Sequence, residues 1–456
     1  MKMTVIGGGG VRSMMLAKSL AQNAEELSID EVVFMDNNEQ KLNIYGELAR
    51  QVALRIYPGW KFSLTTDAVE AVRDADYIIT TIRVGEDDKR IDDEKIALAK
   101  GVLGQETTGA AGFSFAMRSV PALAEYCELI RKYARPQAKV FNFTNPAGVV
   151  SQTLRDMGYD FTYGICDAPT GMLRGFAKLY GVEPEKVTAT CYGLNHLSFF
   201  ESVKMEGKEM LPVLLDDDRV YTETDMRFFS KELAHKFGCA LNEYLYYFFY
   251  PEKAVQNILE AGVTRGEVIR DVNRHMTEEL SRLDPGKDFD ACIETYVKWH
   301  GKRSAMYMKN ETKVCRPEPF TFDLFSRDDG GYAGVALQFI RAQQTGKPTE
   351  MIFCVPNNGA IPGLLDTDVV EISCTVQPDG SYTPHRIREP KELPMEIIRR
   401  VKLYERYASK AIRTCSRDDA VTCLMVHPLV NSYSLAEELV DEYLASNREY
   451  IGRWNR

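Results

Sequence analysis

Four short blocks of the chain hold the polar side chains that are best suited to chemistry. They read GQETTG at residues 104–109, NPA at 145–147, CDAP at 166–169 and YGLNH at 192–196. Within them, Cys166 and His196 offer a thiolate and an imidazole, two ligands that suit a divalent ion of borderline softness. Because the chain contains 10 cysteines and 6 histidines, ordinary core packing is the alternative explanation of this pair.

Glycines form a second candidate site, where a short apolar run ends near the N-terminus. The segment VIGGGGVRS contains Gly7, Gly8, Gly9 and Gly10. Glycine at a turn from strand to helix lets the backbone approach a pyrophosphate, and the helix N-terminus supplies N–H donors. Asp36 closes the next apolar run and is placed to accept ribose hydroxyls, which favours NAD over NADP. A turn without a ligand is the alternative, because Arg12 replaces the third glycine of the usual GxGxxG pattern.

The elements that must position these blocks follow a βαβ order in the N-terminal half. Short β-branched runs alternate there with longer stretches of helical periodicity. Strands are expected at Met3–Ile6, Glu31–Met35, Tyr77–Ile82, Lys139–Phe143 and Phe161–Ile165, and helices at Arg12–Asn23 and Asn38–Ile56. This order predicts a parallel sheet with right-handed crossovers, and the loops after its strands form a ligand crevice. The polar blocks should therefore converge on one place.

The second half of the chain mixes long helical stretches with further strands. Helices are expected at Phe228–Phe249 and Pro394–Arg413, and strands at Met351–Val355 and Val369–Val376. No linker rich in serine or glycine separates the two halves. We therefore expect an α/β fold with a Rossmann-like NAD-binding domain at residues 1–198, packed on an α+β substrate and oligomerisation domain at residues 199–456.

Composition excludes several classes of protein. The 456 residues carry a net charge of −10, which offers no basic surface for nucleic acid or for an anionic membrane. No stretch reaches the length of about 18 apolar residues that a membrane span requires. The cysteines contain no CxxC pair, which favours a reducing cytoplasm over an oxidising compartment. A cytoplasmic enzyme that acts on a small molecule is the expectation.

Taken in order, the sequence blocks resemble glycoside hydrolase family 4, the NAD- and divalent-metal-dependent glycosidases, and within it the 6-phospho-glucosidases. The resemblance runs over essentially the whole chain, through GGGG at 7, IRVG at 82, GQETTG at 104, NPAG at 145, CDAP at 166, YGLNHLSF at 192, NEYLYY at 242, TRGEV at 264, NNGAI at 357 and SNREYIG near the C-terminus. It implies a small phosphorylated glycoside as substrate. It also implies an N-terminal sheet similar to that of lactate and malate dehydrogenases, and a homodimer or homotetramer.

The same resemblance implies roles for single residues. It places manganese, with Co²⁺ or Ni²⁺ as alternatives, on Cys166 and His196, the catalytic base on Tyr244, and the cofactor beside Arg83. The residues implied for the 6-phosphate and the sugar hydroxyls are Arg90, Glu106, Asn145 and Arg265. Without the resemblance, core packing would be the default interpretation of Tyr244, which lies in an aromatic-rich segment. A solvated charge would be the default for Arg90.

The mechanism that the resemblance implies is a redox-assisted elimination, in contrast to attack by two carboxylates. NAD takes a hydride from C3 of the sugar, which acidifies the proton on C2. The metal polarises the C2 and C3 oxygens, and Tyr244 removes the C2 proton. The aglycone then leaves from C1, water adds to the double bond, and the hydride is returned.

Asp167, directly after Cys166, bears on which anomer is cleaved. Family members that resemble 6-phospho-α-glucosidases carry aspartate there, where it can protonate an axial leaving oxygen, and this favours the α anomer. GQETTG and the SNREYIG end look more like the β members, while NNGAI resembles the α members. A 6-phospho-β-glucosidase therefore stays the alternative, with Asp167 only orienting His196 or a metal-bound water.

Two functions outside the family are alternatives. A plain NAD-dependent 2-hydroxy acid dehydrogenase would share the N-terminal sheet and accumulate NADH, but it leaves CDAP and NEYLYY without a role. A non-catalytic NAD-binding sensor would bind dinucleotide without any metal dependence. It leaves the converging polar loops without a purpose.

Overall fold

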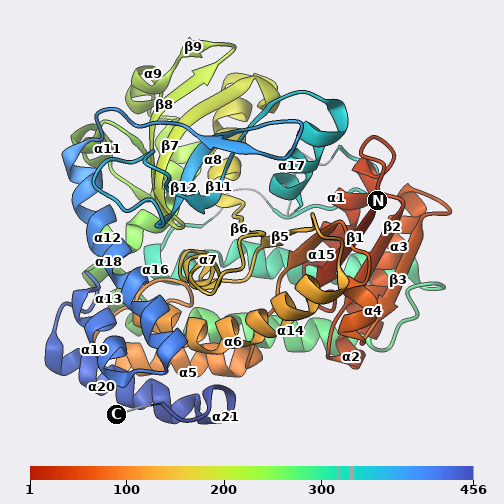
Figure 1. Cartoon of the computed structure of the whole chain (residues 1–456), viewed down its shortest axis with the longest axis horizontal. Helices are drawn as coiled ribbons and strands as arrows, with labels where there is room; N and C mark the ends of the chain where they lie inside the picture. Colours follow the sequence, from red (N-terminus) through yellow and green to blue (C-terminus); the bar gives the residue numbers. More distant parts are fainter. Residues whose placement is uncertain (316–318, 328–332, 455–456) are drawn as a thin grey trace.

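The computed structural model describes residues 1–315, 319–327 and 333–454, and this part of the chain is built around one sheet of 13 strands (Figure 1). The main path of the sheet is β10-β8-β7-β12-β11-β6-β5-β4-β1-β2-β3, with β9 paired to β8 and β13 paired to β12. The strands are β1 Lys2–Ile6, β2 Glu31–Met35, β3 Lys61–Thr65, β4 Tyr77–Thr80, β5 Lys139–Asn142, β6 Thr162–Gly164, β7 Val187–Leu194, β8 Leu197–Met205, β9 Lys208–Glu209, β10 Ala240–Leu241, β11 Thr349–Pro356, β12 Val369–Val376 and β13 Tyr382–Pro384.

Helices connect the strands, and the last helices return to the N-terminal half of the chain. In Figure 1, α20 and α21 lie beside α5 and α6, and packing of α20 on α5 and of α21 on α6 joins them. The helices are α1 Ser13–Asn23, α2 Glu39–Lys41, the π-helical turn η1 Leu42–Gly46, α3 Glu47–Ile56, α4 Ala68–Val72, α5 Glu86–Ala99, α6 Ala110–Tyr133, α7 Ala147–Asp156, α8 Ala168–Tyr180, η2 Pro184–Lys186, α9 Leu211–Asp216, α10 Val220–Glu223, η3 Asp225–Phe228, α11 Lys231–Phe237, η4 Glu243–Leu245, α12 Tyr246–Phe249, α13 Pro251–Ala261, α14 Arg265–Leu280, α15 Phe289–Ala305, α16 Lys309–Thr312, α17 Gly334–Thr345, α18 Glu392–Thr414, α19 Arg417–Val426, α20 Tyr433–Ser446 and α21 Arg448–Ile451.

Six neighbouring strands, β3, β2, β1, β4, β5 and β6, run parallel. The predicted βαβ order and the Rossmann-like sheet are therefore confirmed. The edge strand β3 was not predicted, because its sequence KFSLT is half polar and its burial pattern shows no clean alternation. In the second half, α18 confirms the helix expected at Pro394–Arg413, and β11 and β12 confirm the two expected strands.

Gly164 lies where the parallel part of the sheet meets the antiparallel part. It pairs with Cys354 of β11 in an antiparallel register. A Cβ at Gly164 would lie 2.4 Å from Ser151 Oγ and 2.8 Å from Cys354 Cβ, so a side chain there would force its neighbours apart. Cys166 follows this junction directly in the chain. The division into two domains at residue 198 stays a prediction.

The helix predicted over Phe228–Phe249 is wrong. Phe228 is instead the last residue of η3, and the residues after it form α11, β10, η4 and α12. Gly238, at φ +57°, ends α11 in the left-handed conformation that favours glycine. Ala240 and Leu241 then pair with β8, and the side chain of Asn242 accepts the Tyr244 N–H. Tyr244 therefore lies on a tight turn beside the sheet.

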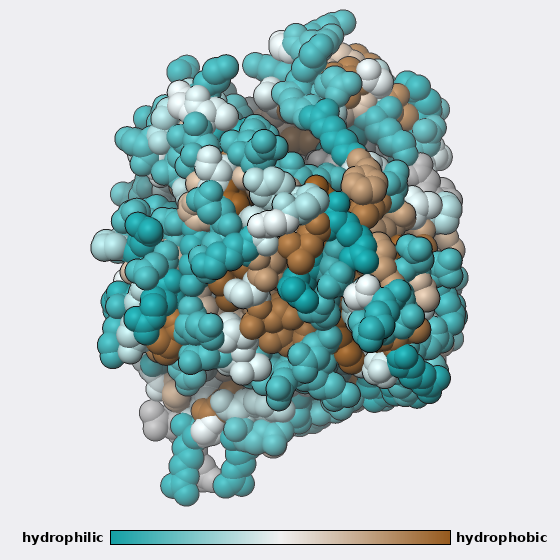
Figure 2. Space-filling model, turned by 90° about the vertical axis from the view of Figure 1, so that its right-hand side faces the viewer, coloured by the Kyte–Doolittle hydropathy of each residue, from teal (hydrophilic) through white to brown (hydrophobic). Residues whose placement is uncertain are grey.

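Most large apolar side chains are buried, and Phe141 and Phe199, from opposite halves of the sheet, are both fully inaccessible. The face shown in Figure 2 is mostly hydrophilic, with a limited group of hydrophobic residues near its centre. Within the described ranges, no helix is both long enough and apolar enough to cross a membrane.

Candidate active site

Two adjoining cavities lie at the C-terminal ends of the parallel strands. The larger has a volume of about 890 Å³ and is lined by residues that follow β1, β2 and β4. The smaller, of about 580 Å³, is lined by residues that follow β6 and by parts of η4 and α15. The polar residues that line both cavities are Arg12, Arg90, Glu106, Asn145 and Arg303. These residues form a shared wall, and a ligand bound there faces both cavities.

The glycine turn lines the larger cavity with backbone. A Cβ on Gly7, whose φ is +99°, would lie 2.4 Å from the Thr81 carbonyl oxygen. A Cβ on Gly8 would lie 2.6 Å from Phe34 Cβ. The turn leads into α1, so its N–H groups and the helix N-terminus suit a pyrophosphate. The residues present therefore fit a dinucleotide.

Asp36 closes β2 beside this turn and lines the same cavity. Its Oδ2 accepts the Gly9 N–H at 2.9 Å, and its Oδ1 accepts the Asn38 N–H at 3.0 Å. These two hydrogen bonds fix the carboxylate where a ribose diol would meet it in a dinucleotide-binding fold.

Cys166 and His196 come together in the smaller cavity. The Cys166 Sγ lies 3.5 Å from the His196 Nε2, and both side chains are buried. His196 lies in the turn between β7 and β8 with φ +62°. Its other ring nitrogen, Nδ1, lies 3.1 Å from Thr107 Oγ1, and this contact fixes the ring orientation.

Burial sets the protonation of this pair. It lowers the pKa of His196 to about 3, so the imidazole is neutral near pH 7, as metal binding requires. Burial, together with the charge of Asp167, raises the pKa of the Cys166 thiol well above its ordinary value, so a thiolate there needs a neighbouring cation. The described part of the chain contains no group of three His, Cys, Asp or Glu side chains arranged for a metal. Cys166 and His196 thus supply two ligands, and a metal bound there would take its other ligands from substrate or water.

Tyr244 stacks on His196, with ring centroids 3.7 Å apart and ring planes at 2°. Asn242 accepts the Tyr244 N–H at 3.0 Å, and this turn places the phenol in the smaller cavity. Burial raises the pKa of Tyr244 well above its ordinary value. A cation held by the neighbouring Cys166 and His196 would oppose this rise and favour the phenolate.

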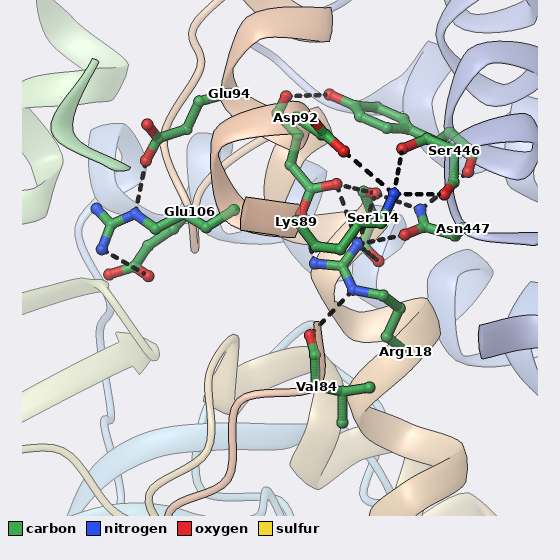
Figure 3. Close-up of polar contacts among 12 residues, drawn as sticks. Val84, Lys89, Asp92, Glu94, Glu106, Ser114, Arg118, Ser446 and Asn447 are labelled. Carbon is green, nitrogen blue, oxygen red and sulfur yellow. Dashed lines mark hydrogen bonds and ion pairs between the residues drawn. The ribbon is translucent and has the colours of Figure 1, made fainter. Parts of the chain in front are cut away.

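Ion pairs hold part of the shared wall, and Figure 3 shows the contacts at Glu94 and Glu106. Glu106 pairs with Arg83 at 2.6 Å and with Arg90 at 3.1 Å, and the Arg90 Nε donates to Glu94 at 2.8 Å. Burial alone would raise the pKa of Glu106, but the two guanidinium groups hold it well below its ordinary range. Arg90 is thus a buried, fixed cation, although its acidic neighbours in the sequence suggested a solvated one.

Arg265 begins α14 and adds a further cation near this wall. Its Nη2 donates to the Arg303 carbonyl oxygen at 3.0 Å, whereas its buried Nη1 has no hydrogen-bond partner among the described residues. Burial and the charge of Arg90 lower the pKa of Arg265, so an anion placed between them would be strongly stabilised. Sequence reasoning did not assign Arg303, because no motif surrounds it, and it left the role of Arg12 open.

Asp167 lines the smaller cavity, with Oδ1 4.0 Å from the Cys166 Sγ. It precedes α8, and within the described structure its side chain makes no capping hydrogen bond to that helix. Of the site residues predicted from the sequence, only Gly8 lies outside the described linings of both cavities. The structure thus brings the other predicted site residues together.

Comparisons with known proteins show which family the chain matches. The profile of the family 4 glycosyl hydrolases matches residues 2–182, and the profile of the family 4 glycosyl hydrolase C-terminal domain matches residues 191–430. The chain is 30% identical to the 6-phospho-beta-glucosidase BglT of Thermotoga maritima over 455 residues, 99% of each chain. It is 26% identical to the maltose-6'-phosphate glucosidase MalH of Clostridium acetobutylicum over 464 residues, 98% of this chain and 97% of that protein.

Solved structures show the same fold. The 6-phospho-beta glucosidase from Thermotoga maritima, crystallised with manganese, NAD+ and glucose-6-phosphate, matches with a TM-score of 0.82 at 28% identity, over 100% of both chains. A malate dehydrogenase from Salinibacter ruber matches with a TM-score of 0.52 at 13% identity, over 91% of this chain and 99% of that one. The latter confirms the predicted dehydrogenase-like fold. With both family profiles and a full-length relative in agreement, this chain belongs to family 4 of the glycosyl hydrolases.

Proposed function

We propose that this protein hydrolyses 6-phospho-glucosides with the help of NAD and a divalent metal, Mn²⁺ first among the candidates. The observation that carries the proposal is the shared wall, because Arg90, Glu106 and Asn145 line both cavities. A sugar bound at this wall faces the glycine turn on one side and Cys166 and His196 on the other. The relatives named above act on 6-phosphorylated glucosides, and one solved relative holds manganese, NAD+ and glucose-6-phosphate.

The roles that we propose are those implied by the family resemblance, and the positions of the residues support them. When bound, NAD at the glycine turn and the metal at Cys166 and His196 would supply reversible oxidation of the sugar and polarisation of its oxygens. Tyr244, held against the His196 ring, takes the proton from C2 of the sugar. Arg265 and Arg90 bind the 6-phosphate, a task that suits the planar fork of arginine.

The shared wall also positions the substrate and the cofactor. Asn145 binds sugar hydroxyls through its side-chain amide. Glu106 stays ionised between Arg83 and Arg90, so it keeps both guanidinium groups in place and accepts a hydrogen bond from the sugar. Arg83 contacts the cofactor from the loop after β4.

Asp167 is our candidate for the acid that protonates the leaving oxygen, and this assignment favours the α anomer. Its carboxylate lines the cavity that contains Cys166, and no capping bond to α8 occupies it in the described structure. The β anomer stays the alternative, because BglT is a 6-phospho-beta-glucosidase. A plain dehydrogenase is less favoured, since it gives Cys166 and Tyr244 no task.

The test is hydrolysis of the α and β anomers of p-nitrophenyl glucoside 6-phosphate, each with and without NAD and Mn²⁺. We expect release of p-nitrophenol from the α anomer only when both are present. Asp167→Asn should slow cleavage of maltose 6'-phosphate, whose sugar leaving group must be protonated, more than cleavage of the p-nitrophenyl α anomer, because p-nitrophenolate can leave without an acid. Release from the β anomer alone would keep the family reaction and remove Asp167 as the acid. No release from either anomer would contradict the proposed function. A cytoplasmic location and a homodimeric or homotetrameric state stay predictions.

A further inference from the structure

The last helix of the chain contributes to the larger cavity. Glu449 and Tyr450 of α21 line it together with Asp36 and the loop after β4. In the described structure neither residue lines the smaller cavity. The roles assigned above do not use them, and they lie far along the chain from the glycine turn.

Buried polar contacts hold α21 in this place (Figure 3). Asn447 donates from Nδ2 to Ser114 Oγ at 2.7 Å and accepts a hydrogen bond from Arg118. Arg118 also pairs with Asp93 at 2.6 Å and donates from Nε to the Val84 carbonyl oxygen at 3.2 Å. Because Val84 lines the larger cavity, one buried guanidinium joins the C-terminal turn to the cavity wall.

Lys89 makes a second connection to the same segment. Its Nζ donates to the Ser446 carbonyl oxygen at 2.9 Å and pairs with Asp92 at 3.1 Å. Lys89 itself lines the larger cavity. α21 also packs on α6, the helix that supplies Ala122 and Tyr126 to that cavity. Two helices that line the larger cavity, α5 and α6, therefore hold α21 in place.

The residues that line only the larger cavity identify which half of a dinucleotide would lie there. Asp36, Ala122 and Tyr126 are among them. Asp36 and Tyr126 line the same cavity, and burial, followed by the charge of Asp36, raises the pKa of Tyr126. In dinucleotide-binding folds the carboxylate at the end of the second strand holds the adenosine ribose. The nicotinamide half would then reach the shared wall.

We propose that the turn Glu449–Tyr450 is part of the dinucleotide site and contacts the adenosine half of the cofactor. The inference rests on the proposed function, since it needs NAD as the ligand. The Tyr450 side chain lines the cavity and is 38% exposed, so its ring retains surface that a nucleoside covers. Aromatic rings stack on bases through their faces, without any requirement for hydrogen bonds.

Isothermal titration calorimetry on Tyr450→Ala tests the proposal. The matched control is Tyr433→Ala on α20, a tyrosine that is 58% exposed and outside the described linings of both cavities. The ligands are NAD, ADP-ribose, and glucose 6-phosphate with Mn²⁺ in the absence of NAD. For Tyr450→Ala we expect the Kd of NAD and of ADP-ribose to rise about tenfold, and the Kd of glucose 6-phosphate to stay unchanged. Tyr433→Ala should bind all three ligands as the unmodified protein does.

The other outcomes separate this inference from the proposed function. If the unmodified protein bound neither NAD nor ADP-ribose, the proposed function would fail. If it bound both and Tyr450→Ala bound them equally well, only the inference would be overturned. Weaker binding of NAD with unchanged binding of ADP-ribose would place Tyr450 on the nicotinamide half and overturn the adenosine assignment. Equal weakening of all three ligands would indicate a general structural role and also overturn it.

Discussion

The glycine turn presents backbone to the larger cavity, whereas Cys166, His196 and Tyr244 present side chains from distant segments to the smaller one. At the glycine turn, a Cβ on Gly7 or Gly8 would collide with neighbouring strands. At the smaller cavity, the ring of Tyr244 stacks on His196. His196 comes from the turn between β7 and β8, and Tyr244 comes from η4, which follows β10. Binding at the glycine turn therefore depends on the backbone conformation. Chemistry in the smaller cavity depends on a few side-chain atoms in defined places.

This difference determines how each cavity should respond to substitution. A pyrophosphate is bound by many weak donors, so no single side chain dominates its affinity. Proton transfer and metal binding each depend on one atom at one distance, so removal of that atom should be severe. Substitutions in the smaller cavity should therefore have larger effects than substitutions in the larger one.

The largest effect is expected for Tyr244→Phe, which removes the hydroxyl and keeps the ring on His196. Loss of a general base lowers kcat by about 10³-fold, and steady-state kinetics with NAD and Mn²⁺ would measure it. NAD affinity should stay unchanged. Tyr250→Phe is the control, since Tyr250 belongs to the same aromatic segment but lies outside the described linings of both cavities. Equal kcat values for Tyr244→Phe and the unmodified protein would remove Tyr244 as the base.

Cys166→Ser should weaken Mn²⁺ binding by at least about 100-fold, because even supporting residues around a metal are worth 10- to 100-fold. Metal binding must also release the thiol proton, since burial holds the pKa of Cys166 well above its ordinary value. The Mn²⁺ association constant of the unmodified protein should therefore rise about tenfold per pH unit near neutrality. Titrations at several pH values measure both effects.

Cys415→Ser is the control for this substitution, because Cys415 is a free, half-buried cysteine outside the described cavity linings. Metal affinity that is independent of pH, or equal in the two serine variants, would contradict the assignment of Cys166. Oxidation offers an independent check. It should release the metal reversibly, with recovery after dithiothreitol and Mn²⁺ are added.

The sequence predicted the backbone turn of the larger cavity better than the side-chain cluster of the smaller one. The glycine turn and Asp36 were predicted from the residues themselves, because a strand, a turn and a helix are encoded by neighbouring residues. Cys166 and His196 were a weak pair by spacing alone, and Tyr244 was singled out only by resemblance. The residues around Tyr244 predicted a helix and did not indicate the turn that places Tyr244 against His196.

The remaining features of the site depend on contacts between segments that are distant in the sequence, so local patterns did not predict them. The segment around Tyr244 has helical periodicity, but pairing of β10 with β8 and the left-handed Gly238 interrupt the helix. Arg303 lies in an ordinary helical stretch, and only the approach of α15 to α14 brings it beside Arg265. Tyr450 reaches the larger cavity because α21 packs on α6, a contact that no local pattern encodes.

A smaller effect is expected for Arg265→Ala at the phosphate end of the substrate. Loss of a charge-assisted hydrogen bond of about 2 kcal/mol should lower kcat/KM about 30-fold for a 6-phosphorylated glucoside. Competition by unphosphorylated glucose should change little. Arg274→Ala is the control, because Arg274 lies on the same helix, α14, and its side chain is 54% exposed. If Arg265→Ala weakened phosphorylated and unphosphorylated ligands equally, Arg265 would not bind the phosphate.

The smallest effect is expected for Asp36→Ala in the larger cavity. Its carboxylate is fixed by the Gly9 and Asn38 N–H groups, and its charge repels the 2'-phosphate of NADP. Removing that charge should lower the ratio of NAD affinity to NADP affinity about tenfold. NAD should bind more weakly, and NADP should bind more tightly because the repulsion is relieved. The turn itself should still bind pyrophosphate, because its N–H groups remain in place. Calorimetric titration with both dinucleotides measures the ratio. A loss of all dinucleotide binding would mean that Asp36 holds the turn together, and that the larger cavity depends on a single side chain as strongly as the smaller one does.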